Sequence, residues 1–448
     1  MVVVDAGGSL VPPGRSLALV EGSRELEQRR IKARLIAGAW KLGGIDALAV
    51  GADDWALGRD FVLELATEEE LPVLAANLTC DGERPLPGSR VVEVGGRRVG
   101  LVGITTGEVD GCTVEPPVDA VRAAVASLGQ VDVVIGLAPE KRAEAVAELG
   151  EVGIDLLFDA RGKHTTDLPD QMGDAWAFGS GTRGKHVGLL EIAFDPAADR
   201  FAPSGVADVE RERLERIQQR LQSLESRVAQ EKDPRRRTRW QNQVSAYEDQ
   251  LDDARSRVAA AEAGDAVVKH GLSNTEVALS RDVENEPRVE EQVQAALEAI
   301  VKMEGGNAQF AVEPHVGPHE SPWAGSDSCV ACHKQQHLQW SSTSHAHAWQ
   351  TLVNEKRHMD RDCFSCHATG VGKPGGPKEP KDVLGLRDVQ CEACHGAAKS
   401  HIARPDLVKP LRDPGIEVCR DCHDGEQDGG RFDFETYRPK IVHGRASE

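Results

Sequence analysis

Short aliphatic runs alternate with segments of helical periodicity over the first 203 residues. Each run is bounded by Gly, Asp or Pro and is typical of a buried or nearly buried strand. The runs are VVVDAG, IDALAVGAD, PVLAANL, RVVEVGG, RRVGLVGIT, VDVVIGLA and IDLLFDA. Helical periodicity lies between them, for example over residues 26–42 and 120–128. Residues 1–203 are therefore predicted to form a layered α/β domain with helices on the faces of a sheet.

The apolar spacing changes after residue 203. Apolar residues then recur every three or four positions in two stretches, which are Leu214, Ile217, Leu221, Leu224 and Val228, and then Trp240, Val244, Tyr247, Leu251, Ala254, Val258 and Ala261. This period predicts two amphipathic helices within residues 208–263. The intervening KDPRRR is short, and Pro234 disfavours helix at Asp233, so an antiparallel hairpin is expected. The hairpin is either a packed arm or a coiled coil that binds a partner or a second copy.

The remaining chain divides into a connector, a linker and a last domain. A strand at 275–279 and a helix at 288–302 complete a segment that spans residues 204–304. A Pro-, Gly- and His-rich linker covers 305–326, and the last domain covers 327–448. This domain has few aliphatic runs, so its own side chains supply only a small core. Something else must fill the interior.

Charge and hydropathy narrow the classes of partner. The chain has 53 Lys and Arg against 73 Asp and Glu, a net charge of −20, which disfavours nucleic acid and anionic membranes as partners. No run of about 20 apolar residues occurs, so we expect no transmembrane segment. The opening MVVVDAGGSL lacks the pattern of a signal peptide. A complementary redox protein fits this charge better.

Eight of the ten cysteines form four CxxCH motifs: CVACH, CFSCH, CEACH and CRDCH. The motif is the attachment signal for c-type haem, because two cysteines form thioethers and the next histidine binds the iron. Structural zinc or a disulfide framework could also use paired cysteines, but neither requires histidine at the same place each time. The pattern therefore predicts four haems, which also fill the core. The residues involved are Cys329, Cys332, His333, Cys363, Cys366, His367, Cys391, Cys394, His395, Cys419, Cys422 and His423.

The second axial ligand of each iron decides between electron transfer and ligand chemistry. The other histidines of this region are His315, His319, His337, His345, His347, His358, His401 and His443. For His315, His319 and His358 the simplest interpretation is a histidine without a role at iron.

The neighbourhoods of the motifs resemble a known family. SSTSHAHAWQTL, CFSCHATGVGKPGG and VQCEACHGAAKSH resemble segments of the tetrahaem cytochromes c that carry electrons in ammonia oxidation, and the resemblance covers residues 327–443. It implies that His345, His401 and His443 are distal ligands. It also implies that the haem of the second motif can keep an open face. Alternatively His347, His337 or His358 closes that face. We expect a fourth histidine ligand, with His347 as its first candidate, because the candidates outnumber the vacancy.

The α/β region resembles the calcineurin-like metallophosphoesterases of the 5′-nucleotidase type. VVVDAGGSL stands where that family has DxGD, IDALAVGADDWALG where it has GNHE or GNHD, and GIDLLFDARGKHTT where it has GHTH. Most of the family's metal ligands are replaced. Gly8 stands in place of the bridging Asp, Ala52 and Asp53 in place of the Asn and His of GNH, and Pro139 in place of a further His. Asp5, Asp53, Asp54 and His164 remain. We expect no phosphoesterase metal centre, and a structural platform or docking surface instead.

Cys80 and Cys112 lie outside the four motifs. They are a disulfide, two buried thiols or a reactive thiol site, and their spacing does not decide between these. Because haem is attached to CxxCH outside the cytoplasm, we expect a periplasmic or extracellular protein whose signal has been removed or left out of the gene model. The absent first strand of the phosphoesterase pattern also favours a processed or incomplete N-terminus.

The functional expectation is electron transfer by a tetrahaem cytochrome fused to a degenerate phosphoesterase-like scaffold. Its donor and acceptor would be redox proteins, and the hairpin could mediate a homo-oligomer. The alternative is a haem oxidoreductase that acts on a small nitrogen or sulfur compound at one open haem. Hydrolysis of a phosphoester is the third candidate, opposed by the replaced ligands.

Overall fold

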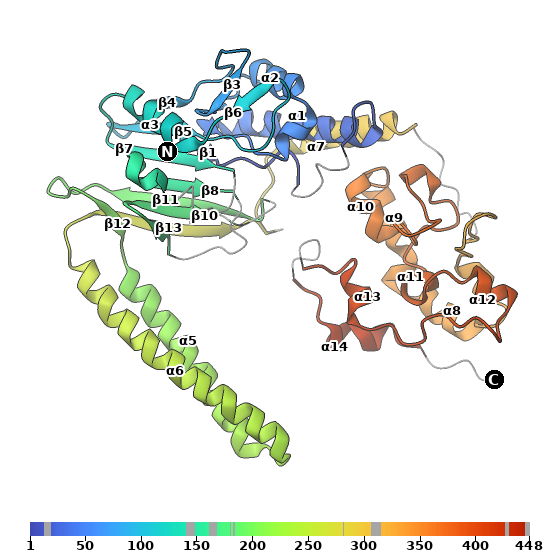
Figure 1. Cartoon of the computed structure of the whole chain (residues 1–448). Coiled ribbons are helices and arrows are strands. Elements are labelled where there is room, and N and C mark those ends of the chain that lie inside the picture. The colour runs from blue at the N-terminus through green and yellow to red at the C-terminus, as the bar shows by residue number, and fades with distance from the viewer. Residues whose placement is uncertain are drawn as a thin grey trace. The chain divides into compact units, whose positions relative to one another are not determined.

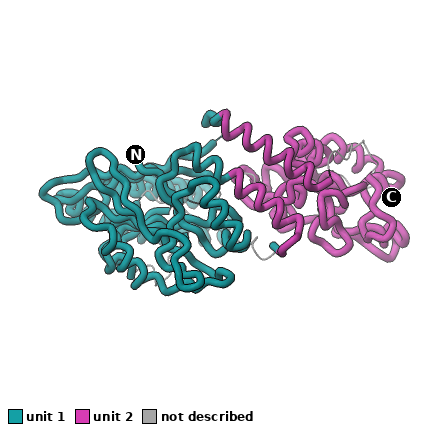
Figure 2. The backbone as a smooth tube through the Cα atoms, turned by 90° about the horizontal axis from the view of Figure 1, so that it is seen from above, with its two compact units in different colours: residues 1–19, 36–286 teal, residues 20–35, 287–448 magenta. Residues whose placement is uncertain are grey.

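The computed structural model describes most of the chain and divides it into two compact units. The described residues are 1–12, 19–139, 148–160, 168–179, 181, 184–280, 282–305, 315–425 and 430–443. Unit 1 contains residues 1–19 and 36–286, and unit 2 contains residues 20–35 and 287–448 (Figure 2). Helix α1 (Arg24–Gly43) contributes its first part to unit 2 and its last part to unit 1.

Unit 1 is built on a six-stranded sheet with the order β4-β5-β7-β8-β10-β9 (Figure 1). Strands β5, β7, β8 and β10 are parallel, while β4 and β9 pair antiparallel at the two edges. The bounds are β4 (Ser89–Val94), β5 (Arg97–Gly103), β7 (Val133–Ala138), β8 (Leu156–Asp159), β9 (Asp170–Met172) and β10 (Ala175–Gly179). Every residue of β7 is buried, as expected for a parallel strand covered on both faces.

Two apolar clusters cover the two faces of this sheet. One joins the sheet to α3 (Pro117–Ser127) and to the 3₁₀ turn η3 (Glu148–Val152) through Val121, Ala124 and Leu149. The other joins it to the pair β1 (Val4–Asp5) and β2 (Ala47–Leu48) and to a second, three-stranded sheet. The layered α/β architecture predicted for this region is therefore confirmed.

The three-stranded sheet has the order β11-β13-β12. Strand β13 (His270–Ala278) lies between β11 (His186–Ala193), which is antiparallel to it, and β12 (Phe201–Pro203), which is parallel. The strand expected at 275–279 is thus the second half of a longer one. Because β13 follows the hairpin in sequence and pairs with strands before it, both ends of the hairpin are fastened to unit 1.

Cys80 and Cys112 form a disulfide. They are paired residues of β3 (Leu78–Cys80) and β6 (Cys112–Val114), a two-stranded antiparallel ribbon. The free-thiol alternatives are thereby excluded for this structure. The turn η2 (Asp54–Leu57) and helix α2 (Arg59–Glu68) complete the described helices of unit 1 apart from the hairpin.

One predicted strand has a different form. Residues 73–77 of PVLAANL are buried between β2 and β5, where a single bridge joins Leu48 to Val73 in place of a ladder, and Leu78 begins β3. Leu74 donates a hydrogen bond to the Leu48 carbonyl and Ala76 donates one to the Gly103 carbonyl. The segment crosses from one neighbour to the other, so it is too short on either side to count as a regular strand.

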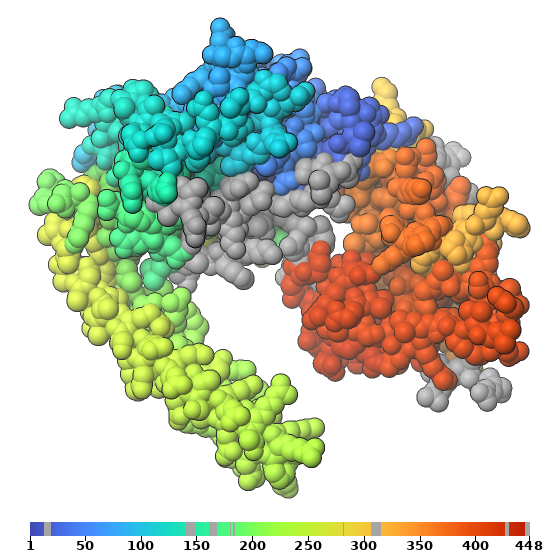
Figure 3. All heavy atoms as spheres, in the orientation of Figure 1, coloured from blue at the N-terminus to red at the C-terminus, as the bar shows by residue number. Residues whose placement is uncertain are grey.

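The hairpin consists of α5 (Val206–Gln230) and α6 (Pro234–Asp265) and extends from the α/β layers (Figures 1 and 3). The Asp233 carboxylate accepts hydrogen bonds from the backbone N–H groups of Arg235 and Arg236, so it caps α6, and Pro234 occupies the first helical position. Leu224 and Ala254 are buried between the helices. The predicted antiparallel hairpin is present and is longer at both ends than the apolar stripe.

Unit 2 is helical, with α7 (Pro287–Met303) followed by short helices and turns. These are η4 (Ser326–Cys329), α8 (Lys334–Ser341), η5 (Ser344–His347), α9 (Ala348–Asn354), α10 (Arg361–His367), η6 (Pro380–Asp382), α11 (Cys391–His395), α12 (Lys399–Ala403), α13 (Ile416–Arg420), α14 (Phe434–Tyr437) and η7 (Arg438–Lys440). Its described apolar cluster has only five buried residues, Trp349, Leu352, Phe364, Ala368 and Val383. Across the described parts of both units, no helix has the length and apolar character needed to span a membrane.

Candidate functional site

Two of the four CxxCH motifs form complete short helices. The second motif lies within α10 and the third forms α11, so each pair of cysteines lies one turn apart on one side of the helix. The first motif begins at the end of η4 and the fourth at the end of α13, and the backbone N–H of each histidine bonds the carbonyl of the first cysteine. All eight cysteines are free. Two free cysteines one helical turn apart, followed by a histidine, are the local geometry that thioether attachment of haem requires.

Three motif histidines face a second histidine. The ring centres are 6.4 Å apart for His333 and His401, 6.4 Å for His423 and His345, and 5.7 Å for His395 and His443. Two imidazoles that bind one first-row metal from opposite sides, each nitrogen about 2 Å from the ion, place their ring centres roughly 6 Å apart. The spacing therefore leaves room for one iron, and for the plane of a porphyrin, between the rings of each pair.

Backbone carbonyls orient several of these rings. The Nδ1 atoms of His395, His401 and His367 lie 2.6, 2.7 and 2.6 Å from the carbonyl oxygens of Leu411, Val408 and Ala348. Because a carbonyl oxygen only accepts, Nδ1 carries the proton and Nε2 keeps its lone pair for a metal. This is the outer-shell arrangement found at metal-bound histidines.

Burial and neighbouring rings favour neutral imidazole at His333 and His345. Burial lowers the pKa of His333, and the nearby rings of His401, His443 and His395 lower it further. Burial, followed by His423, also lowers the pKa of His345. Neutral imidazole is the form that binds iron.

His367 of the second motif has no histidine facing it among the described ring contacts. The Nδ1–H of His367 is held by Ala348, with the Thr351 hydroxyl 3.4 Å away. His347, the first candidate for this distal position, is exposed and makes no described ring contact.

The other predicted candidates for the fourth distal position have different surroundings. The ring of His315 bonds the Asp388 carboxylate at 2.9 Å, and His337 lies beside Asp327 and Trp340. His358 is buried, and burial followed by the charge of Arg387 lowers its pKa. His319 is exposed.

The four motifs are close neighbours in the fold. Thiols of different motifs interact with one another: Cys329 with Cys391, Cys394 with Cys419 and with Cys422, and, third, Cys366 with Cys422. The first contact is the largest cause that raises the pKa of Cys329, and the third does the same for Cys422. The order of neighbours is therefore first, third, fourth and second motif.

Buried polar residues that the sequence did not single out hold the first and third motifs together. The Glu392 carboxylate, inside the third motif, accepts hydrogen bonds from the backbone N–H groups of Ala324, Gly325 and Ala398. The preceding Gln390 accepts one from Ser326. Both side chains are about 1% exposed. A carboxylate between the two cysteines of CEACH was the only signal in the sequence, and by itself it does not name its partners.

An open cavity of about 690 Å³ adjoins the fourth motif. Its lining includes His423, Arg420 and Phe432, and the ring of Phe432 stacks on His423 at 4.4 Å between centres. A cavity of this size is in the usual range for a bound organic cofactor. The fourth motif thus combines a histidine that is stacked on an aromatic ring with a cavity next to it.

Carboxylates that remain in the phosphoesterase-like segments bind the backbone of the loops in these segments. The Asp54 carboxylate is buried and accepts four backbone hydrogen bonds, from Gly8, Leu10, Val11 and Gly51. Burial raises its pKa to about 6. A Cβ atom added to Gly7 or Gly51 would lie 2.9 Å from Cβ of Pro139, so the proline fills the space between the two loops.

Asp5 is likewise engaged by its own loop. Its carboxylate accepts hydrogen bonds from the Gly7 backbone N–H and the Ser9 hydroxyl, and burial raises its pKa. Among the residues described, no three His, Cys, Asp or Glu side chains gather as metal ligands would. The predicted remnant His164 lies outside the described residues.

Comparisons with known proteins return the same two groups that the motifs indicated. Residues 328–396 match the family of cytochrome c554 and c-prime. Cytochrome c-554 of Nitrosomonas europaea is 34% identical to the chain, with 23% of this chain and 58% of that protein covered. The chain thus spans less than two thirds of the length of this relative.

Several solved structures are similar to the N-terminal region. The sulfate thiohydrolase SoxB of Thermus thermophilus is 22% identical, with 43% of this chain and 35% of that one covered and a TM-score of 0.35. A 5′-nucleotidase precursor of the same organism is 21% identical, with 43% and 42% covered and a TM-score of 0.32. The calcineurin-like phosphoesterase YfkN of Bacillus subtilis is 16% identical, with 44% and 72% covered and a TM-score of 0.34. Residues 328–396 of this chain are thus similar to the cytochrome c554 and c-prime family, in one polypeptide with an α/β region similar to phosphoesterases.

Proposed function

We propose that the protein transfers electrons through four covalently bound c-type haems, one on each CxxCH motif. The observation that carries this proposal is the spacing of the three histidine pairs, each of which fits one iron between its rings. Haem supplies a one-electron couple at its iron, and histidine on both faces suits electron transfer because it leaves no position for substrate. The protein contributes the ligands, their orientation and the surrounding charge.

The proposed axial pairs are His333 with His401, His395 with His443, and His423 with His345. His367 binds the fourth iron from one side only. The neighbouring thiols support a path in the order first, third, fourth and second haem. A chain of close haems lets electrons enter near one end and leave near the other. The donor and acceptor would be redox proteins that dock at these ends.

The haem count is the first test. Intact-mass analysis of the matured protein, together with a pyridine haemochrome assay, should give four haems per chain. Peptide mapping should find haem on each CxxCH. A mature chain that carries zinc or cystines at these cysteines would refute the proposal.

The axial ligands are tested by carbon monoxide, which binds reduced haem only at an open position. The wild-type protein should bind it at one haem. His401→Ala should add a second site and convert one low-spin ferric haem to high-spin, since its partner His333 then lacks a distal ligand. His319→Ala, which removes an exposed histidine of the same unit, should change neither value. Failure of the wild-type protein to bind carbon monoxide would restore a fourth histidine ligand, with His347 the first candidate.

A second candidate function follows from His367 itself. Because no described histidine ring faces it, its haem would have an open face at which a small nitrogen or sulfur compound could be reduced or oxidised. Turnover of such a compound that disappears when carbon monoxide saturates the single open site would favour an oxidoreductase. Unchanged electron transfer to a redox protein under the same conditions would favour a carrier.

We also propose a periplasmic or extracellular location. The disulfide between Cys80 and Cys112 belongs to an oxidising compartment, as does the maturation of c-type haem. The α/β region then acts as a platform for the haem-bearing unit.

A further inference from the structure

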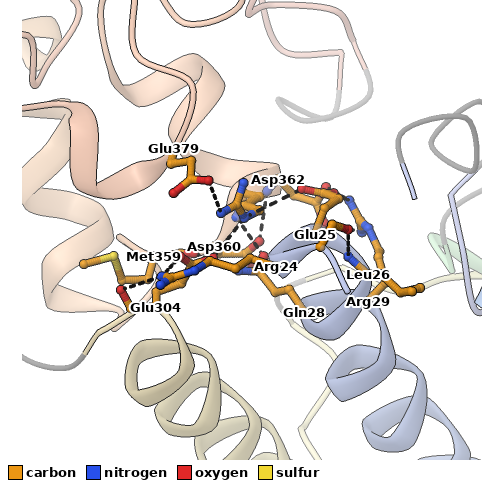
Figure 4. Close-up of polar contacts among 12 residues, drawn as sticks. Arg24, Glu25, Leu26, Gln28, Arg29, Glu304, Met359, Asp360, Asp362 and Glu379 are labelled. Atoms are coloured by element: carbon orange, nitrogen blue, oxygen red, sulfur yellow. Dashed lines mark hydrogen bonds and ion pairs between the residues drawn. The ribbon is translucent and has the colours of Figure 1, made fainter. Parts of the chain in front are cut away.

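The first part of α1 is attached to the helix that carries the second CxxCH motif. Residues 20–35 precede most of the α/β region in sequence, yet they belong to unit 2. There they contact residues 359–362, which lie directly before Cys363 (Figure 4). No pattern in the sequence indicated this contact.

Two cations of α1 meet the carboxylates at the start of α10. The Arg29 guanidinium donates to both carboxylate oxygens of Asp362, one of them at 2.7 Å. The Lys32 ammonium donates to Asp362 at 2.7 Å and also pairs with Asp360. The side chains of Arg29 and Asp360 are each 3% exposed, so solvent screens these charges weakly.

A neutral side chain fixes the backbone at the same place. The Gln28 amide donates to the Met359 carbonyl at 2.9 Å, and its oxygen accepts from the Arg361 backbone N–H at 2.9 Å. Gln28 is 2% exposed. Asp360 caps α10 by accepting from the Asp362 backbone N–H. The first turn of α10 is therefore held by α1 through both backbone and side-chain contacts.

A buried glutamate extends this network to a third element. Glu304, directly after α7, has a fully buried carboxylate that pairs with Arg24 of α1 and with Arg361 of α10. Buried charges of this kind tolerate few other arrangements, because a displaced partner leaves an uncompensated charge in the interior. The network thus defines the position of α10 against α1 and α7.

The same charges act on the haem-attachment position. Burial and, after it, the charge of Asp360 raise the pKa of the Cys363 thiol, and Lys32 opposes this, so that the pKa is about 12. These charges are therefore near enough to Cys363 to influence it. A haem bound there would experience them too.

We propose that Arg29 and Lys32 are positioning residues for the haem of the second motif: they fix α10 and place positive charge beside this haem. The inference rests on the proposed function, since it requires haem on Cys363 and Cys366. Without Arg29, the Lys32 ammonium alone would pair with both Asp360 and Asp362, so this cluster would carry one more negative charge. Extra negative charge favours the ferric form, which carries one more positive charge than the ferrous form, so the midpoint potential of this haem would fall.

The test is a redox titration of the full-length, haem-loaded protein. Arg29→Gln should shift one of the four midpoint potentials to a more negative value and leave the other three in place. The shifted haem should be the one that binds carbon monoxide. Arg29→Lys, which keeps the charge, should restore most of the wild-type potential.

Arg30→Gln is the matched control. Arg30 is the next residue of the same helix, but it pairs with Glu21 and Glu27, which are 78% and 49% exposed. The variant removes the same charge from the same segment. Because the partners of Arg30 are exposed and solvent screens their charges, all four potentials should stay unchanged. Equal shifts in the Arg30 and Arg29 variants, or no shift in either, would overturn the inference.

A double variant keeps the test valid if Arg29→Gln fails to fold. Arg29→Gln with Asp362→Asn removes both charges of the pair and leaves neither buried alone, and its midpoint should return towards the wild-type value. A double variant with the same shift as the single variant would contradict an electrostatic role. The haem count separates the two proposals: absence of haem from the peptide with Cys363 refutes the proposed function, whereas four haems with no shift refute only this inference.

Discussion

Asp54 shows how one residue of a replaced metal motif serves a structural role. Its two carboxylate oxygens accept four backbone hydrogen bonds and so tie the loop after β1 to the loop after β2. Only 1% of the residue is exposed. Burial raises its pKa from 3.8 to about 6, although the four hydrogen bonds act in the opposite direction. The carboxylate thus serves to hold the two loops together.

Asp54 should therefore give the stability of unit 1 a specific pH dependence. Between about pH 4 and 6 the folded state binds a proton at Asp54 that the unfolded state does not. The contribution of Asp54 to the free energy of unfolding therefore falls as pH rises, by about 3 kcal/mol in total. Asp54→Asn cannot titrate. The free energy of urea unfolding, wild type minus variant, should thus be larger at pH 4 than at pH 7.

Asp60→Asn is the control for this measurement. Asp60 has a side chain that is 77% exposed, and its replacement should leave the pH dependence of unfolding close to that of the wild type. A difference between wild type and Asp54→Asn that is constant with pH would show that the hydrogen bonds outweigh burial and keep the carboxylate ionised.

Residues with a fixed local spacing could be predicted, and residues whose partners lie far along the chain could not. The twelve CxxCH residues follow from one repeated motif. Glu392 and Gln28 have no such motif, because their hydrogen-bond partners lie 68 and more than 300 positions away in the sequence. Their polarity and burial together identify them, and burial is known only from the fold.

At the scale of elements, periodicity predicts what each segment forms better than what it contacts. The hairpin helices follow from apolar spacing and a proline, and both are present. Helix α1 also has a clear period, but its two parts pack in different units, and the period alone does not show this. PVLAANL has the composition of a strand, yet its residues before Leu78 form no ladder because they cross between two neighbours.

The hairpin should unfold locally when its inner contact is weakened. Leu224 of α5 is 1% exposed and packs between the helices. Leu224→Ala should destabilise the hairpin by roughly 2–5 kcal/mol because it leaves a cavity. Amide hydrogen exchange should increase throughout α5 and α6 and stay unchanged in β7. Gln222→Ala, at an exposed position two residues earlier, should leave exchange nearly unchanged. Increased exchange in β7 of the Leu224→Ala variant would mean that the hairpin supports the sheet.

At the scale of the whole molecule, the two units should depend differently on haem. Unit 1 has two large apolar clusters on one sheet, whereas unit 2 has a described cluster of five buried residues. The helices from α8 to α14 have between four and eight residues, too short to be stable without tertiary packing. Haem would supply most of that packing.

A chain with all eight motif cysteines replaced by serine should therefore fold only in part. Its circular dichroism should keep the signal of the sheets and the hairpin and lose helical signal from unit 2. Trypsin should cut throughout residues 315–443 and also after Arg29 and Lys32, since the partners of these side chains on α10 are no longer held in place. In the haem-loaded protein the same bonds should resist cleavage, because Arg29 is buried against Asp362. Equal protection of residues 315–443 with and without haem would mean that the polypeptide alone supplies the core of unit 2. Protection of Arg29 in the haem-free chain would mean that α1 binds α10 before haem is attached.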